Sequence, residues 1–226
     1  ATLLPFTGLG NNWAQGHIDL DPLYDELLAE QNCKYLFIVS NGIRQVFTTD
    51  PVEKLEDFKG MKLRSSGRWQ VLWLESLGVG TVQMPSSEAY MALQRGVVEG
   101  ILTSMTSYDN FKMWEVCKHI TRMDQSIGNE RVAMNLDVWN SLPGDIQQLM
   151  LDIDLEVSDF GFEQQMAYAE EAYGRLQKEQ GVTIHLLSDE ERARWVESAM
   201  FAWDQCEKEV PSAKPLIDVY REFAAG

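Results

Sequence analysis

Two arginines, Arg44 and Arg64, are the residues whose type and position in this sequence could recognise a ligand. Arg64 ends the short predicted strand MKLR, and a loop containing Gly67 follows it. Arg44 lies in the segment SNGIRQVFTT, where we expect an Asn-Gly turn to lead into a strand that begins at the arginine. A planar guanidinium can donate two parallel hydrogen bonds to one carboxylate. The pattern therefore predicts recognition of a small organic acid, not chemistry performed on one.

The elements around Arg64 alternate between strand and helix. After the arginine the sequence predicts a helix, a strand ending near Met84, a further helix, and a strand that ends at Thr103. In such units the ends of strands face the place where small ligands bind.

The helix after Arg64 brings two more candidates near the same strand end. Trp69 recurs with Leu72, Trp73 and Leu77 at the spacing of a buried helix face, so these residues are predicted to pack in the core. Trp69 is the one of them that could also touch a ligand. Arg68 could be a third cationic contact, although its place one residue into the helix favours a solvent-facing side chain.

Three helical stretches end in a glycine that is followed by a β-branched run. The glycines are Gly78, Gly96 and Gly181. Glycine tolerates the left-handed conformation that ends a helix, and valine-rich runs suit strands. The repeated unit predicts α/β architecture with parallel strands.

A long helical pattern fills the region from Pro143 to Gly181. We expect this helix to be kinked near Gly161 and to run across two lobes, because an unbroken helix of that length would be about 55 Å long. The segment from Ser188 to Glu191 resembles a capping box that opens another helix. A last helical stretch is expected after Pro211, and the initial residues ATLLPF are expected to form a strand.

Composition and motifs exclude several functional classes. The 226 residues carry 35 acidic and 19 basic side chains, a net charge of −16, which argues against nucleic acid or an anionic membrane surface as partner. No stretch is apolar for long enough to span a bilayer. The sequence contains no P-loop, nucleophile elbow, zinc-protease motif or dinucleotide-binding motif, so we predict neither an enzyme nor a cofactor.

The cysteines and histidines are few and scattered. Cys33, Cys117 and Cys206 are widely spaced, which disfavours a zinc site and leaves open one disulfide with a free thiol. Cys117 and Cys206 could be buried small hydrophobic residues. His185 stands in a strand-like context, where a structural role is favoured over catalysis.

An ordered series of motifs carries a family resemblance. The segments are NGIRQ at 41–45, DFKGMKLRSSG at 57–67, MPSSEAYMALQRGVVEG at 84–100, FKMWEVCKHIT at 111–121 and NLDVWNSLPGDIQQLM at 135–150. In this order they resemble the substrate-binding proteins of TRAP transporters, which capture organic acids such as sialic acid or C4-dicarboxylates in the periplasm. The motifs cover nearly the whole chain.

The resemblance implies a periplasmic-binding-protein-like fold of two α/β lobes with a long bridging helix. On this basis residues 1–40 would end lobe I and 41–127 would form lobe II. Residues 128–165 would return to lobe I, and 166–226 would complete the bridging helix and lobe II. Arg64 would make the main salt bridge to the ligand carboxylate and Arg44 would be a second donor, with Ser66, Ser86 and Thr103 lining the site. The partners would be the ligand and the membrane permease subunits, which would read lobe closure.

This sequence departs from the family at the pocket and at its beginning. Thr103 replaces a ligand-contacting asparagine, Ser86 an aromatic residue, and Ser66 a proline, so sialic acid cannot be carried over and another mono- or dicarboxylate is expected. Family members have about 90 to 100 further residues at the front, so the amino-terminal lobe is expected to be incomplete. If it is, an exposed apolar face would favour self-association. A ligand-sensing protein of the same fold, an enzyme on this scaffold and a non-binding fragment are the alternatives.

Overall fold

The computed structural model describes residues 4–7, 13–124 and 126–225. Its helices and strands run along the chain in this order: α1 (Trp13–Ala29), β1 (Cys33–Thr48), η1 (Leu55–Phe58), β2 (Lys62–Arg64), α2 (Arg68–Ser76), β3 (Gly80–Val82), α3 (Ser86–Gln94), β4 (Gly100–Ser104), α4 (Met105–Asn110), η2 (Met113–Glu115), β5 (His119–Arg122), β6 (Ile127–Asn135), α5 (Leu136–Ser141), α6 (Gly144–Asp152), α7 (Asp154–Gln180), β7 (Thr183–Leu186), α8 (Asp189–Glu209), η3 (Pro211–Ala213) and α9 (Lys214–Ala225).

The strands form a mixed sheet, which confirms the α/β class. The strand order is β3-β2-β4-β1-β5-β7, and β6 pairs with β1. The pairs β2–β3, β2–β4 and β5–β7 are parallel, as the repeated helix–glycine–strand pattern predicts. The prediction of parallel strands fails for β1, which runs antiparallel to β4, β5 and β6.

The strand that carries Arg44 is much longer than predicted. β1 spans Cys33–Thr48 without interruption, so the expected Asn-Gly turn before Arg44 is wrong. Gly42 has φ +89° and lies at an irregularity in the pairing with β6, which makes it part of a β-bulge inside the strand. Residues 33–43 pair with β6, and residues 44–48 pair with β4 and β5. β1 therefore passes from one sheet ladder to the other at Arg44.

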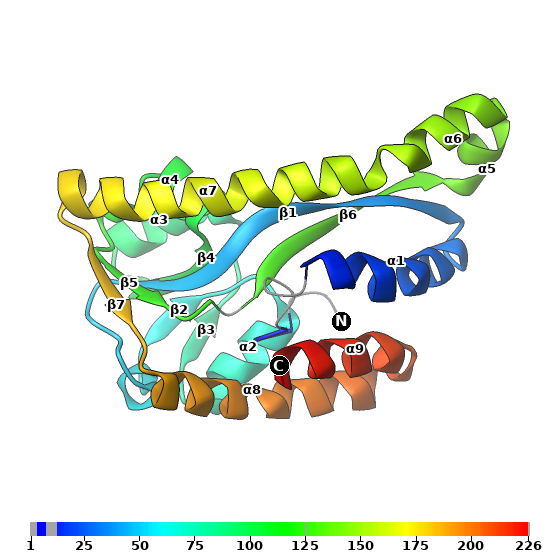
Figure 1. The fold of residues 1–226 in the computed structure, drawn as a ribbon. Helices are drawn as coiled ribbons and strands as arrows, with labels where there is room; N and C mark the ends of the chain where they lie inside the picture. Colours follow the sequence, from blue (N-terminus) through cyan, green and yellow to red (C-terminus); the bar gives the residue numbers. More distant parts are fainter. Residues whose placement is uncertain (1–3, 8–12, 125, 226) are drawn as a thin grey trace.

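The long helical pattern is divided at a different residue from the one predicted. α6 ends at Asp152, Ile153 breaks the helix, and α7 continues unbroken through Gly161. Acidic residues in a first turn favour a helix N-terminus, and Asp154 and Glu156 occupy the first turn of α7. Figure 1 shows α7 running along one side of the molecule over the sheet, as expected for a helix that bridges its two halves.

The predicted helix ends are confirmed in the described residues, whereas the strand predicted at the beginning of the chain is not. Gly78, Gly96 and Gly181 have positive φ angles, as expected where helices end. The Ser188 hydroxyl accepts a hydrogen bond from the Glu191 backbone N–H (3.2 Å) and caps α8. The expected strand at ATLLPF is wrong for residues 4–6, which contain a turn, and residues 1–3 lie outside the described part.

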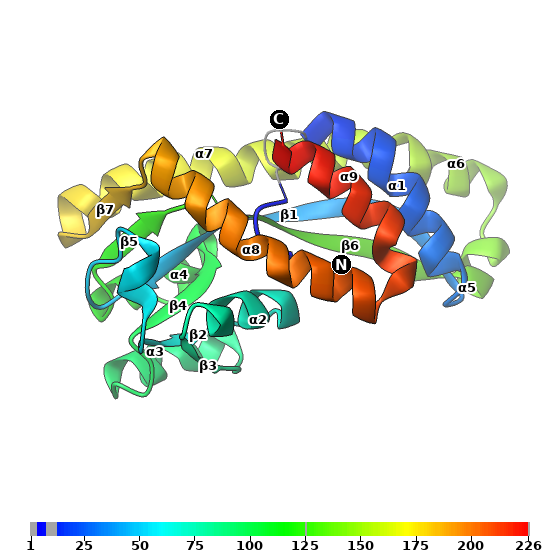
Figure 2. The same ribbon diagram turned by 90° about the horizontal axis from the view of Figure 1, so that it is seen from below.

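Three hydrophobic clusters stabilise the molecule. The first joins α1, α9 and the end of α8 to β1, and Figure 2 shows α1 and α9 side by side. The second cluster packs α3, α4 and α7 on the sheet. The third packs α2 and α8 on other residues of the sheet. Cys117 and Cys206 are fully buried in these clusters, and all three cysteines are free thiols. The division into the four predicted lobe segments stays a prediction.

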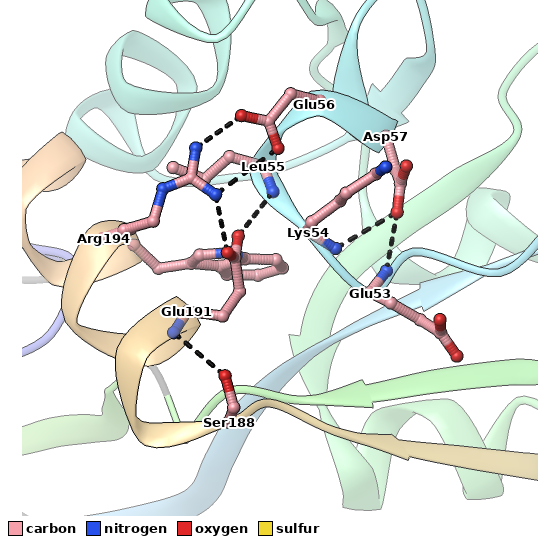
Figure 3. A network of polar contacts seen from close by, with 9 residues as sticks. Glu53, Lys54, Leu55, Glu56, Asp57, Ser188, Glu191 and Arg194 are labelled. Atoms are coloured by element: carbon pink, nitrogen blue, oxygen red, sulfur yellow. Dashed lines mark hydrogen bonds and ion pairs between the residues drawn. The ribbon is translucent and has the colours of Figure 1, made fainter.

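A polar network attaches the loop after β1 to α8 (Figure 3). The Glu191 carboxylate accepts hydrogen bonds from the Leu55 backbone N–H (2.8 Å) and from the Trp195 indole (2.8 Å). The same carboxylate pairs with Arg194, which also pairs with Glu56 on η1. These bonds hold η1 on α8, next to the short loop that leads into β2 and Arg64.

Candidate functional site

Arg64 lies at the end of β2, where its side chain is almost fully buried. Arg64 is 3% exposed, and the preceding Leu63 is fully buried in the core. The guanidinium donates two hydrogen bonds to the backbone carbonyl of Met84, from Nε (2.8 Å) and Nη2 (2.7 Å). Burial lowers the pKa of Arg64. The carbonyl therefore fixes one edge of the guanidinium, and neither recorded bond uses Nη1.

Arg44 lies on the other side of β4 from Arg64. Arg44 faces Ser104 of β4 in the antiparallel pair, whereas Arg64 faces Ile101 of the same strand in the parallel pair. Arg44 is 7% exposed, and its Nε is buried with no hydrogen-bond partner among the described residues. Burial lowers the pKa of Arg44 to about 10; the Glu130 carboxylate opposes this shift and the charge of Arg64 adds to it.

The two arginines form a cationic pair on the strands that flank β4, Arg64 at the end of β2 and Arg44 within β1. Each side chain is more than nine-tenths removed from water, and neither has a carboxylate within ion-pairing distance among the described residues. Burying a charge without a counter-ion is costly. An anion bound between them would offset that cost, so the arrangement suits a carboxylate.

The other predicted ligand contacts differ in how deeply they are buried. Thr103 is buried next to the end of β4 and faces Gln45 of β1. Ser86 is half-buried as the first residue of α3, and Ser66 is exposed on the loop after β2. Ser66 follows β2, Ser86 follows β3 and Thr103 lies near the end of β4, and their contact with a ligand stays a prediction.

Trp69 and Arg68 are engaged with the protein itself. Trp69 is 6% exposed and belongs to the hydrophobic cluster of α1, α8 and α9, as the helix spacing predicted. Arg68 points outward, where it pairs with Glu209 and lies 5.3 Å from the centre of the Trp69 ring. Of the three arginines considered, the structure therefore brings together Arg44 and Arg64.

Gln45 anchors the strand segment that carries Arg44, a role that sequence reasoning missed. Its side-chain oxygen accepts bonds from the backbone N–H groups of Met123 (2.8 Å) and Asp124 (2.9 Å). Its amide nitrogen donates to the Tyr173 hydroxyl on α7 (2.9 Å). Gln45 is fully buried. It thereby ties β1 to α7 and to the loop before β6, and a glutamine beside an arginine gives no sequence signal for this.

A second polar cluster lies away from the arginines, on β5 and β7. His119 Nδ1 and His185 Nε2 are 3.0 Å apart, and His185 Nδ1 is 2.8 Å from the Glu53 carboxylate. His185 lies on a strand, as predicted. Within the described ranges no group of three or more histidine, cysteine or acidic side chains could hold a metal ion. Nor does any helix there combine the length and apolar character needed to cross a membrane.

The fold and motifs belong to a known family of binding proteins. Residues 12–209 match the model of the bacterial extracellular solute-binding proteins, family 7. The chain is a member of that family.

Individual relatives support the assignment. A solute-binding protein of Sulfitobacter sp. (strain NAS-14.1) is 32% identical over 64% of this chain and 44% of its own length. The C4-dicarboxylate-binding periplasmic protein of Rhodobacter capsulatus is 32% identical over 70% of this chain and 47% of its own length. The chain thus spans less than half the length of these curated relatives.

Solved structures confirm the fold. A TRAP periplasmic solute-binding protein of Chromohalobacter salexigens with bound D-glucuronate superposes with a TM-score of 0.87, covering 97% of this chain and 73% of that one at 20% identity. At that identity the likeness shows the two-lobe α/β fold alone.

Proposed function

We propose that this chain captures a small organic acid as the solute-binding subunit of a TRAP-type transporter and delivers it to the membrane permease. The ligand carboxylate binds to Arg64 through the guanidinium edge that Met84 leaves unused, and Arg44 is the second donor. One observation carries the proposal: two buried guanidinium groups stand beside the same strand without a carboxylate partner among the described residues.

The proposal places the chain in the periplasm, where the family captures its solutes. A ligand there passes to the permease unchanged, so the site needs charge and shape complementarity and no reactive group. The acid bound can differ from those of the relatives, because the residues around the arginine pair set its size and polarity.

Removal of the Arg64 guanidinium tests the ligand contact directly. A bidentate charge-assisted contact in a desolvated site is worth about 2–5 kcal/mol, so Arg64→Ala should weaken binding at least ~30-fold. Arg64→Lys should not restore affinity, because a single ammonium cannot form two parallel hydrogen bonds. Calorimetric titration with D-glucuronate and with succinate measures the change. Arg192→Ala, which removes an exposed arginine of α8, is the control and should bind as the parent does.

A measurement without a chosen ligand tests the whole proposal. Native mass spectrometry of the purified chain, followed by denaturing release, should recover a co-purifying organic acid of unaltered mass. Parent-like binding by Arg64→Ala would remove Arg64 from the site. Failure of every tested acid to bind to the parent chain would reject the proposed function itself.

A further inference from the structure

Gln45 is a buried polar residue that lies next to two residues of the proposed site. It follows Arg44 in β1, its side chain is fully buried, and it faces Thr103 of β4 in the antiparallel pair. Arg44 is the proposed second donor to the ligand, and Thr103 is a predicted ligand contact. Whatever holds Gln45 in place therefore also holds the strand segment that carries Arg44.

The Gln45 amide uses its whole hydrogen-bonding capacity inside the protein. An amide side chain has one oxygen that accepts up to two bonds and one nitrogen that donates two. Oε1 of Gln45 accepts from the backbone N–H groups of Met123 (2.8 Å) and Asp124 (2.9 Å). Nε2 donates to the Asp124 carboxylate (2.6 Å) and to the Tyr173 hydroxyl (2.9 Å). Because these four bonds occupy the amide, Gln45 acts on the site through the groups that it holds and not by touching a ligand.

Asp124 is bonded to Gln45 through both its backbone and its side chain. Its φ is +45°, in the left-handed region that is costly for a residue with a side chain and that surrounding contacts must maintain. Asp124 lies two residues after the end of β5 and three before the start of β6. The two bonds to Gln45 therefore stabilise the conformation in which the chain passes from β5 to β6.

The main chain of Arg44 is bonded to the same connection between strands. Its backbone N–H donates to the Ser126 carbonyl (2.8 Å). Its Nε, by contrast, is buried without a hydrogen-bond partner among the described residues. The strand, and not a bond at Nε, therefore places this part of the guanidinium. A shift of β1 against Asp124 and Ser126 would move the charge that meets the ligand.

The bonding pattern between Gln45 and Asp124 can be inverted by exchanging the types of the two side chains. Gln45→Glu alone brings a carboxylate against that of Asp124 with no proton between them, and like charges repel strongly where water is excluded. When Asp124→Asn is added, the new amide donates to the new carboxylate, which still accepts from the two backbone N–H groups. The Tyr173 hydroxyl can donate as well as accept, so it fits either pattern.

We infer that Gln45 is a positioning residue of the ligand site, because its amide holds the segment of β1 that carries Arg44 against Asp124 and against α7. The inference rests on the proposed function, since Arg44 is the residue that is positioned. Affinity should therefore follow the contact between positions 45 and 124, and not the charge of either residue alone.

The exchange variants test the inference. Calorimetric titration with D-glucuronate and with succinate measures affinity, and urea unfolding of the same preparations shows that the titrated protein is folded. Gln45→Glu should weaken binding of the acid that the parent binds about tenfold or more, and Gln45→Glu/Asp124→Asn should return to within about threefold of the parent. Asp124→Asn alone keeps an acceptor for Nε2 and should also stay within about threefold of the parent.

Two further variants complete the design. Tyr173→Phe is milder than Gln45→Glu and serves where the latter does not fold; it keeps the ring, leaves one Nε2 donor unpaired and should weaken binding about threefold. Gln148→Glu is the matched control. Gln148 also donates to a carboxylate, that of Asp152 (2.7 Å), but on the exposed surface of α6, so the same change there should leave affinity as it is in the parent.

The outcomes separate the inference from the proposed function. Parent-like affinity of Gln45→Glu, or of Tyr173→Phe where Gln45→Glu does not fold, would show that Gln45 supports the fold alone; the inference is then wrong while the proposed function stands. A double variant that folds but does not regain affinity would equally reject the contact between positions 45 and 124 as the cause. If neither acid binds to the parent, the proposed function fails and the inference fails with it.

Discussion

The two arginines of the site differ in how the protein holds their charge. Arg64 is fixed by two hydrogen bonds to one backbone carbonyl, so its orientation before ligand arrives is set by the fold. Arg44 has a buried Nε without a partner in the described structure, and its charge is opposed by burial and by Arg64. If the two arginines bind the ligand as proposed, Arg64 supplies a binding edge that the fold has already oriented, whereas Arg44 gains most from a nearby anion.

Sequence alone could identify these arginines but not the groups around them. Arg64 ends a short strand in a motif that marks it clearly, and the structure places it at that strand end. Met84 contributes its backbone carbonyl, and the type of its side chain gives no sequence signal for such a contact. Gln45 acts through hydrogen bonds to Met123 and Tyr173, which lie far from it in the chain, and the sequence pattern did not predict the course of β1 that brings them together.

Still at the scale of residues, the His119–His185 pair predicts a loss of stability in mild acid. Burial and the neighbouring His185 lower the pKa of His119, while Asp50 and Glu53 pull it upward. The unfolded chain therefore binds this proton more readily than the folded one. The stability that His119 contributes is present above its ordinary pKa of about 6.5, and it is lost as the pH falls through that value toward the lowered pKa.

Urea unfolding at pH ~7.5 and ~5.5 measures this effect. His119→Gln should lose less unfolding free energy between the two pH values than the parent does, because glutamine does not titrate. Asp50→Asn should lose more, because the carboxylate that favours the charged imidazole is gone. Equal losses in all three proteins would show that the pair has no part in the acid sensitivity.

At the scale of elements, the contact between η1 and α8 depends on one carboxylate. Glu191 satisfies a backbone N–H of η1 and the indole N–H of Trp195, whose side chain is fully buried. Glu191→Ala should lower the unfolding free energy by about 1–3 kcal/mol, since it leaves buried donors unpaired. Urea denaturation measures the change.

The neighbouring Glu190 provides the matched control. It is exposed in the same first turn of α8, so Glu190→Ala removes a similar interaction with the helix dipole and should cost about 0.5 kcal/mol. If both variants lose the same free energy, the Glu191 network contributes nothing beyond that dipole interaction.

The predicted elements agree with the structure where local chemistry decides the conformation. Glycine after a helix and serine before one act within a few residues, and Gly181 and Ser188 lie at the ends of α7 and α8 as expected. The break in the long helix was misplaced because packing along α7 maintains the helix through Gly161, while Asp154 begins a new helix. The unbroken course of β1 through Asn41 and Gly42 was missed because Asn-Gly fits a bulge as well as a turn.

At the scale of the whole molecule, apolar side chains remain exposed along α6 and the start of α7. Leu149 is 56% exposed, Leu155 57% and Phe160 63%. With Ile18 and Pro22 of α1, Leu151 and Leu155 also line an open groove of about 750 Å³ that four aspartates border. The expected self-association stays a prediction for this face, which lies at the opposite end of α7 from β7 (Figure 1).

Arg44 lies where β1 changes from pairing with β6 to pairing with β4 and β5, and we call this segment of β1 the crossing. The bulge at Gly42 lies two residues before Arg44, and β6 pairs with β1 on either side of it. A ligand bound to Arg44, as proposed, would therefore act on the segment where β1 changes from pairing with β6 to pairing with β4 and β5. If binding closes the lobes, this crossing must keep its shape while the elements on either side move.

Gly42→Ala tests how far binding depends on that crossing. Gly42 has φ +89°, and an added Cβ would lie 3.2 Å from Oε1 of Gln165, which accepts a 2.6 Å bond from the Thr106 hydroxyl. Alanine at this φ should cost about 1–3 kcal/mol of stability. Affinity for the acid should also fall, about tenfold for each 1.4 kcal/mol of strain that reaches Arg44. Urea unfolding and calorimetric titration of the same preparation separate the two effects.

Gly161→Ala is the control, because it makes the same chemical change elsewhere on the framework. Gly161 lies inside α7 with ordinary helical geometry and nothing within 4 Å of an added Cβ, so alanine there should raise stability by up to about 1 kcal/mol and leave affinity unchanged. A Gly42→Ala protein that is less stable yet binds as tightly as the parent would show that the bulge supports the fold without positioning Arg44. Weaker binding beyond the loss of folded protein would instead make the crossing the element that couples the two halves to the ligand.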